Sequence, residues 1–114
     1  MADERSELLQ GTLELLVLKT LSLEPMHGWG IAQRIQVISR DVFQVNQGSL
    51  YPALQRMRRK GWVKSQWRVT ENNRRARFYE LTASGRKQLG SQWADWERSS
   101  TAVNRILRFV VEGG

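Results

Sequence analysis

The last third of the chain constrains the fold most, because large side chains recur there at alternating spacings of four and three. Such a repeat places them on one stripe of a single helix over residues 84–111. The members of the stripe are Leu89, Trp93, Trp96, Ser100, Val103, Leu107 and Val110. A helix of that length spans roughly 40 Å, at ~1.5 Å per residue, which is longer than a small domain needs internally. The repeat therefore predicts pairing with a second chain along this helix; packing against its own domain is the alternative.

Shorter elements are expected before this helix. The spacing of apolar residues predicts helices over residues 8–22, 27–39 and 46–60. Alternation predicts strands over residues 62–70 and 76–82, joined by a polar turn at residues 71–75. Val63, Trp67 and Val69 should share one side of the first strand, and Tyr79 and Leu81 should point inward from the second. The two strands are therefore expected to form a β-hairpin with a basic tip.

The third helical segment contains a proline that leaves two starting points open. Its expected buried residues are Leu50, Leu54 and Met57. If Ser49 caps the helix, Pro52 falls in the first turn, where its missing N–H costs nothing. If the helix begins at Asn46, Pro52 loses one hydrogen bond and must bend the helix. Gly61 is expected to end the helix in a left-handed conformation.

Positive charge is concentrated in residues 54–87. Eleven lysines and arginines lie there against two acidic residues, Glu71 and Glu80, whereas the segments on either side are balanced or slightly acidic. The formal net charge of +7 is therefore a local patch. Such a patch repels itself unless an anionic partner neutralises it, and double-stranded DNA is the expected partner.

The composition argues against several other classes of protein. The chain has one histidine, His27, and no cysteine, and it contains neither a phosphate-cradling glycine loop nor a cluster of metal ligands. His27 is expected to cap or pack at a helix start rather than act as a general base. We therefore expect no enzyme activity, no cofactor and no metal. The leucine-rich residues 8–23 are interrupted by polar residues and fall short of a membrane span, so a soluble, cytoplasmic protein is expected.

The order of the elements is that of a winged helix-turn-helix. Three helices, a hairpin and a long last helix make a mainly α (α+β) fold, in which the third helix can enter the major groove and the hairpin forms a wing. We expect a winged-helix DNA-binding domain at residues 1–82. A C-terminal dimerisation helix is expected at residues 83–114, and the two parts should form one compact unit.

The recognition helix should present polar groups on the face opposite its buried stripe. Gln55 and Arg59 are the expected base contacts, because amide and guanidinium groups can pair with base edges. Ser49, Tyr51 and Arg56 are better placed for phosphates.

The wing should add a second set of cationic contacts. Arg74, Arg75 and Arg77 are expected to bind phosphate or to enter a narrow minor groove. The full set of expected DNA-binding residues is Gln47, Ser49, Tyr51, Pro52, Gln55, Arg56, Arg59, Arg74, Arg75 and Arg77.

Four motifs resemble those of PadR-type transcriptional regulators. Residues 48–54 (Gly-Ser-Leu-Tyr-Pro-Ala-Leu), with the basic and Lys-Gly-Trp residues up to position 62, are similar to the recognition-helix signature of that family. Residues 27–31 resemble its second-helix opening, residues 77–85 its second wing strand, and residues 11–13 its first helix. The resemblance covers about residues 8–97. It implies a homodimeric repressor, joined through its first and last helices, that binds an inverted-repeat operator with the recognition helix and the wing.

The same resemblance points to a compact subgroup with one helix after the wing. Many members respond to small aromatic or drug-like molecules, and some hold them between the subunits. Trp93 and Trp96 could line such a pocket or simply fill the dimer core, and both alternatives stay open. The expected dimer interface, which is also the candidate ligand pocket, comprises Leu89, Trp93, Trp96, Val103, Leu107 and Val110.

A second class of function also stays open. A dimeric module of this kind could bind a ligand or a protein without reading DNA. Salt dependence separates the two, because DNA affinity falls with a log–log slope of roughly −0.9 per neutralised phosphate, whereas an apolar interface is nearly insensitive to salt. RNA is less favoured, since single-strand binders expose aromatic rings for stacking, and here most rings fall in core or seam positions.

Overall fold

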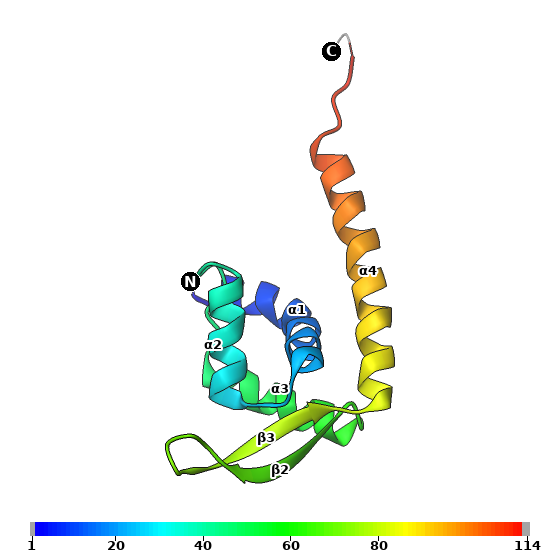
Figure 1. The fold of residues 1–114 in the computed structure, drawn as a ribbon. Coiled ribbons are helices and arrows are strands. Elements are labelled where there is room, and N and C mark those ends of the chain that lie inside the picture. The colour runs from blue at the N-terminus through cyan, green and yellow to red at the C-terminus, as the bar shows by residue number, and fades with distance from the viewer. Residues whose placement is uncertain (1, 113–114) are drawn as a thin grey trace.

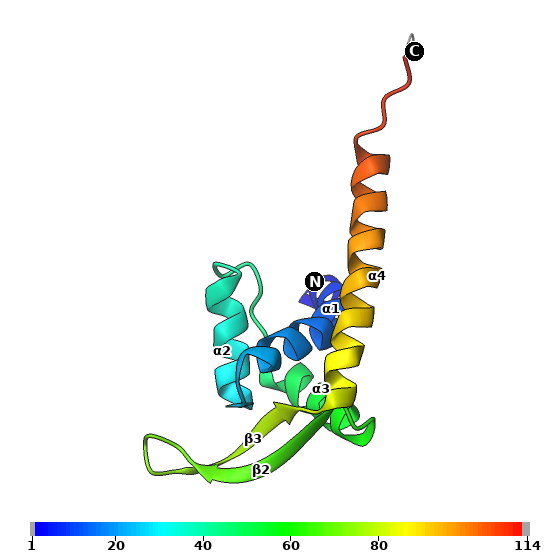
Figure 2. The ribbon, with the colours of Figure 1, turned by 45° about the vertical axis from the view of Figure 1, so that its right-hand side comes forward.

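The computed structural model describes the backbone of residues 2–112 and the side chains of residues 12–112. Its elements are α1 (Ala2–Leu23), β1 (Met26–His27), α2 (Gly28–Ile38), α3 (Gln47–Arg59), β2 (Val63–Val69), β3 (Arg75–Leu81) and α4 (Ala83–Leu107). Helices α1, α2 and α3 form the body, and the β2–β3 hairpin projects from its lower edge (Figure 1). Helix α4 rises beside α1 and continues well past the body (Figure 2). The predicted winged helix-turn-helix with a long last helix is confirmed.

The core lies where the three body helices meet the base of the hairpin. Leu50, Leu54 and Met57 of α3 are fully buried, which confirms the predicted stripe. Tyr79 and Leu81 of β3 are buried against them, also as predicted. Fully burying one such side chain contributes about 1.5–3 kcal/mol, so this contact holds α3 firmly on the body.

The start of α3 is now decided between the two alternatives. The side-chain oxygen of Asn46 accepts a hydrogen bond from the amide of Ser49 at 2.8 Å, so Asn46 is the N-cap. The alternative with Ser49 as the cap is wrong. Pro52 therefore lies inside the helix, where it has no N–H to donate to the carbonyl of Gly48.

The end of α3 follows the prediction for Gly61. This residue has φ +79°, a conformation that glycine adopts without steric cost. The amides of Gly61 and Trp62 donate to the carbonyls of Arg58 and Met57, each at 3.0 Å. That pair of bonds is a Schellman ending, and it turns the chain directly into β2.

A short strand, β1, was not predicted from the sequence. It pairs antiparallel with β3, with Met26 opposite Tyr79 and His27 opposite Phe78, and gives the strand order β1-β3-β2. Two residues are too few to show the alternation by which a strand is recognised. The strand ties the entry of α2 to the base of the wing.

The residue after this pairing begins α2, one position later than predicted. His27 is the N-cap, and its Nδ1 accepts a hydrogen bond from the amide of Gly30 at 3.0 Å. The expected capping role of the single histidine is confirmed. Its ring also meets Phe78 edge to face, at 5.2 Å between centroids.

The hairpin reaches beyond the core that lies under its base. Val63, Trp67 and Val69 alternate onto one side of β2 as predicted, but only Val63 is buried. Trp67 is 55% exposed, because the strand at that point has left the body. The turn is closed by the amide of Thr70, which donates to the carbonyl of Arg74 at 2.7 Å, while Asn73 takes a left-handed φ of +60°.

Helix α4 ends at Leu107, four residues before the predicted end. Phe109 to Val111 follow outside any regular element, so Val110 does not lie on the helix. The prediction was wrong there because the two valines are β-branched and weaken the helix, although their spacing suits the seam. None of the described helices combines the length and apolar character needed to cross a bilayer.

Candidate nucleic-acid interface

An open groove of about 690 Å³ lies between α3, the start of α2 and the wing. From the set of expected DNA-binding residues, the groove brings together Tyr51, Gln55, Arg74, Arg75 and Arg77. His27, Trp29 and Trp67 also line it. The recognition helix and the wing therefore face one shared hollow rather than two separate surfaces.

The place of Tyr51 in this groove depends on a glycine. A Cβ atom added to Gly28 would lie 3.1 Å from the hydroxyl oxygen and the Cε1 atom of Tyr51. The absence of a side chain at Gly28 lets the tyrosine lie across the first turn of α2. The residue is 46% exposed and lines the groove, so the tyrosine is accessible from this position.

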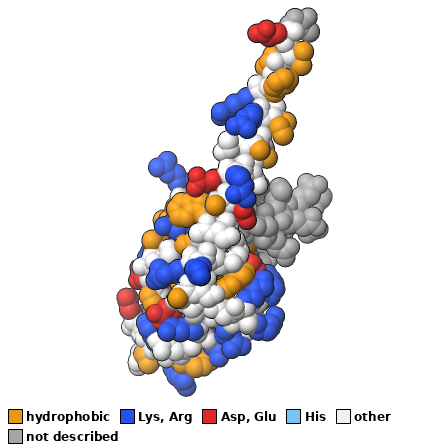
Figure 3. All heavy atoms as spheres, turned by 90° about the vertical axis from the view of Figure 1, so that its right-hand side faces the viewer, with side chains coloured by type: hydrophobic (Ala, Val, Ile, Leu, Met, Phe, Trp, Pro, Cys, Tyr) orange, Lys and Arg blue, Asp and Glu red, His pale blue; other side chains and the backbone are white. Residues whose placement is uncertain are grey.

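The charge of the groove has one sign. Its wing side carries three arginines, and neither Glu71 nor Glu80 lines it. Glu80 lies opposite Lys64 in the hairpin register. Figure 3 shows Lys and Arg side chains gathered over the lower part of the body, below the projecting end of α4. Such a surface attracts a polyanion and is screened by salt.

The outward face of α3 extends this surface past the groove. Pro52 and Arg59 are exposed, and Arg59 has no ion-pair partner among the residues that the structure describes. Ser49 is partly buried, and its amide already donates to the N-cap. The Oε1 atom of Gln47 is buried and finds no hydrogen-bond donor among the described residues. Of these four, Arg59 has the freest side chain for contact with DNA.

Arg56 does not line the groove with the other expected residues. Its Nε lies 3.6 Å from Oε2 of Glu14 on α1, so it joins the recognition helix to the first helix. The two side chains are 44% and 22% exposed, and solvent screening keeps the worth of this pair small. A phosphate contact by Arg56 would compete with Glu14.

The groove lies in the part of the chain that matches a known family. Residues 17–91, which include the recognition helix and the wing, match the family model described as the transcriptional regulator PadR-like family. The chain belongs to the PadR-like family.

Solved structures of PadR-like proteins share the fold. A PadR-like transcriptional regulator from Bacillus cereus is 26% identical, with a TM-score of 0.79, and the match covers 91% of this chain and 99% of that one. A PadR family transcriptional regulator from Eggerthella lenta is 25% identical, with a TM-score of 0.80 and coverage of 96% and 93%. A transcriptional regulator from Clostridium thermocellum, at 22% identity and a TM-score of 0.82 over 90% and 99% of the chains, shows the same fold.

Membership of the PadR-like family makes this chain a DNA-binding transcriptional regulator and not an enzyme. The site agrees with that class, because His27 is occupied as a helix cap. Within the described part of the chain, no group of histidine, aspartate and glutamate residues could hold a metal ion.

In this PadR-like chain the expected dimer seam divides into two parts. Leu89 is partly buried against the core of its own chain. Trp93, Trp96, Val103 and Leu107 are exposed, by 44%, 48%, 53% and 75%, and so is Val110 beyond the helix end. Lys19 of α1 lies 5.5 Å from the ring centroid of Trp93, so this tryptophan marks the boundary between the packed and the free part.

Two residues of this PadR-like surface were missed by sequence reasoning. Arg58 donates from Nε and a terminal nitrogen to Oε1 of Gln55, at 3.3 and 3.2 Å. The i, i+3 spacing of these two residues on a helix was the available signal. Trp67 lies between the wing arginines, and the hairpin register, which sets it opposite Arg77, was the signal there.

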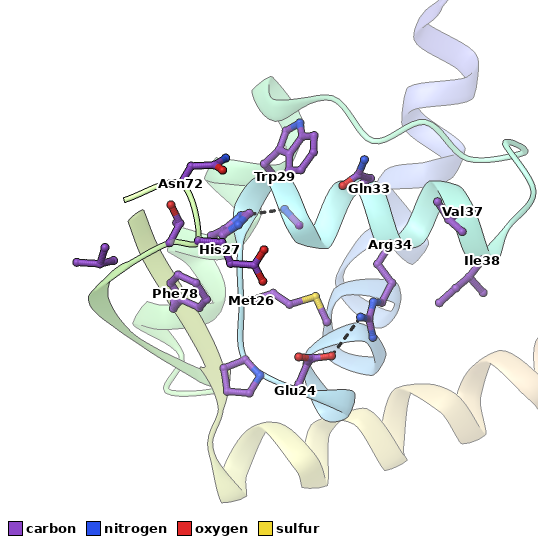
Figure 4. Close-up of a pocket in the computed structure, with 15 residues that line it drawn as sticks. Glu24, Met26, His27, Trp29, Gln33, Arg34, Val37, Ile38, Asn72 and Phe78 are labelled. Carbon is purple, nitrogen blue, oxygen red and sulfur yellow. Dashed lines mark hydrogen bonds and ion pairs between the residues drawn. The ribbon is translucent and has the colours of Figure 1, made fainter. Parts of the chain in front are cut away.

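A second hollow of about 750 Å³, on the outer side of α2, differs in character from the groove (Figure 4). Val37, Ile38 and Trp29 reach it from α2, and Phe78 reaches it from the wing. Its one arginine, Arg34, is paired with Glu24 at 3.1 Å. Since two acidic residues, Glu24 and Glu71, line this hollow against the single arginine, it is not part of the cationic surface.

Proposed function

We propose that this regulator is a homodimeric repressor that binds an inverted-repeat operator. The observation that supports it best is the shared groove, in which the recognition helix and the wing arginines face the same space. A duplex whose major groove receives α3 would bring its phosphates to the wing. On this proposal the winged-helix domain comprises residues 1–82 and the dimerisation helix residues 83–114, and the protein works in the cytoplasm, where it reaches the DNA.

Along α3 and the groove each part has its own role on this proposal. Gln55 and Arg59 contact base edges, since an amide or a guanidinium can make paired hydrogen bonds there. Tyr51 and the wing arginines bind phosphates and set the orientation of the protein on the duplex. Ser49, Gln47 and Pro52 lie at the start of α3, where the helix meets the DNA backbone.

The dimer is proposed from the unpartnered end of α4. This helix has 25 residues and spans roughly 37 Å at ~1.5 Å per residue, and its second half stands clear of the body in both ribbon views (Figure 1, Figure 2). Trp96, Val103 and Leu107 leave a row of apolar side chains in water there. Covering this row with a second copy removes it from water and fixes the separation of two recognition helices.

The proposal includes a small aromatic effector that binds between the two subunits. Trp93 and Trp96 are both about half exposed on α4, so in a dimer they either fill the interface or border a space that a flat ligand could enter. A ligand there would act on repression by changing the spacing of the two recognition helices.

Footprinting on the DNA immediately upstream of this protein's own gene tests the proposal, since many small repressors regulate themselves. We expect two protected half-sites about one helical turn apart, with affinity that falls steeply as salt rises. The Arg59→Ala variant should lose the footprint, whereas Arg105→Ala, which removes the same charge from α4, should keep it. Absence of any duplex binding at low ionic strength would favour the alternative, a dimeric module for a protein or ligand.

A further inference from the structure

Trp67 stands half exposed on the wing, among the arginines of the groove. We propose that it is a positioning residue for DNA binding, whose indole ring holds the guanidinium groups of Arg75 and Arg77 in the groove before DNA arrives. This inference rests on the proposed DNA binding and deepens it, because it assigns a role to an exposed residue of the wing.

The hairpin register brings the three side chains together. Trp67 lies directly opposite Arg77 in the antiparallel pair, and Arg75 is two residues along the same strand, on the same face. The guanidinium carbons of Arg75 and Arg77 lie 5.2 and 5.3 Å from a ring centroid of Trp67. Both distances fall within the roughly 6 Å over which a cation is attracted to an aromatic ring.

The surroundings of Arg77 show that its guanidinium is held rather than free. Its Nε atom is buried and has no hydrogen-bond acceptor among the described residues. A phosphate can therefore reach this guanidinium only through the terminal nitrogens. The ring of Trp67 on one side and the groove on the other fix which way those nitrogens face.

The exposure of Trp67 has no explanation in the packing of this chain. A tryptophan side chain that is 55% exposed leaves a large apolar surface in water. The opposite face of the wing carries a related pair, Arg68 over Phe78 at 5.3 Å, but Phe78 is partly buried and lines the second hollow. Among the described residues, Trp67 is the one whose ring lies against the wing arginines that line the groove.

Because Trp67 holds the two arginine side chains in the free protein, less conformational entropy is lost when DNA binds. Immobilising a long side chain at an interface costs free energy, and two arginines are held here before DNA arrives. Replacing the ring by an aliphatic side chain should therefore weaken binding to any duplex about five- to tenfold. The salt slope should stay the same, because both positive charges remain and displace the same counterions.

Fluorescence anisotropy with a labelled duplex tests this at several salt concentrations. We expect Trp67→Leu to bind about five- to tenfold more weakly, and Trp67→Phe, which keeps a ring, to bind within about twofold of the wild type. Val69→Ala, an exposed apolar residue two positions along the same strand, should bind like the wild type. Thermal unfolding of each variant checks that the fold is retained.

A double-mutant cycle separates positioning from direct contact. In a background with Arg75→Gln and Arg77→Gln, Trp67→Leu should cause no further loss, because there is no guanidinium left to hold. A full five- to tenfold loss in that background would mean that the ring itself touches DNA, and would overturn the proposal. Wild-type affinity in Trp67→Leu would also overturn it.

A measurement without DNA distinguishes this inference from the proposed function. In the free protein the side-chain protons of Arg77 should show ring-current shifts by NMR, and Trp67→Leu should abolish them. Unshifted protons in the wild type overturn the inference while leaving DNA binding intact. A wild-type protein that shows these shifts but binds no duplex at low salt overturns the proposed function and, with it, the positioning role.

Discussion

The side-chain oxygen of Gln55 is held by Arg58, which donates to it from two nitrogens at 3.3 and 3.2 Å. This pair lies on the exposed side of α3, where Gln55 lines the groove. A glutamine that reads adenine uses both its oxygen and its amide nitrogen. In the free protein this oxygen already accepts hydrogen bonds from Arg58. If Gln55 contacts a base, either Arg58 releases the oxygen or only the amide nitrogen of Gln55 bonds to the base.

Gln55→Ala should reduce operator discrimination more than general DNA affinity. Removing a base contact costs about 1–3 kcal/mol at one base pair, roughly 5- to 150-fold, and leaves phosphate contacts in place. Competition between operator and random duplex in an anisotropy assay measures the ratio. Arg105→Ala, far out on α4, is the control that should leave the ratio unchanged, and an equal loss on both duplexes would show that Gln55 reads no base.

The positive charge of the wing leads to a separate prediction about the salt dependence of DNA binding. Replacing Arg74 and Arg75 by alanine should weaken binding to all duplexes, because these exposed side chains sit at the groove and carry no sequence information when they bind phosphates. The log–log salt slope should become shallower by roughly 0.9 for each phosphate that is no longer neutralised. Affinity measured across a salt series gives the slope. A slope that stays at the wild-type value would mean that these two arginines bind no phosphate.

The proposed dimer seam at the exposed end of α4 predicts how self-association responds to the loss of one aromatic side chain. Trp96→Ala should shift the protein toward monomer, because large aromatic side chains at the centre of an interface commonly contribute about 2 kcal/mol or more, roughly 30-fold in the dimer dissociation constant. Sedimentation equilibrium measures that constant. Glu97→Ala, on the next residue and off the seam, is the matched control. A Trp96→Ala protein that dimerises as tightly as the wild type would place the interface elsewhere.

Most of the fold follows from patterns that span many residues. The helices and the hairpin were predictable because each type of element has its own spacing of buried residues. Leu50, Leu54 and Met57 follow helical spacing, whereas Tyr79 and Leu81 alternate as in a strand. The ends were less predictable. The choice between Asn46 and Ser49 as the cap of α3 depends on which side chain turns back to an amide, and both residue types suit that task.

Some features of the site depend on packing between elements and could not be predicted from local sequence patterns. The helical wheel placed Arg56 outward, but the packing of α1 on α3 brings Glu14 to it, and no local pattern encodes that approach. Likewise, alternation placed Trp67 and Val63 on the same face of β2. Val63 is buried and Trp67 is half exposed because the core extends only under the base of the hairpin. The groove itself joins three parts of the fold, the start of α2, α3 and the wing, so it appears only when the wing folds back beside α3.

Two glycines of α4 allow a matched comparison of how an added methyl group changes the free energy of unfolding. A Cβ atom on Gly85 would lie 2.1 Å from the carbonyl oxygen of Trp62 and 2.8 Å from Cδ2 of Leu81, so α4 could not keep its close approach to the end of the hairpin. Gly85→Ala should lower the free energy of unfolding by about 1–3 kcal/mol or more, since the nearest atom belongs to the backbone and cannot rotate away.

The same change at Gly90 should act in the opposite direction. Nothing lies within 4 Å of a Cβ atom there, and the residue is exposed within the helix. Gly90→Ala should raise the free energy of unfolding by up to about 1 kcal/mol, because alanine restricts the unfolded chain and favours the helix. Urea unfolding followed by circular dichroism measures both variants. If Gly85→Ala proved as stable as Gly90→Ala, the first turn of α4 would not pack on the hairpin as described, and the wing and α4 would lose their fixed relation.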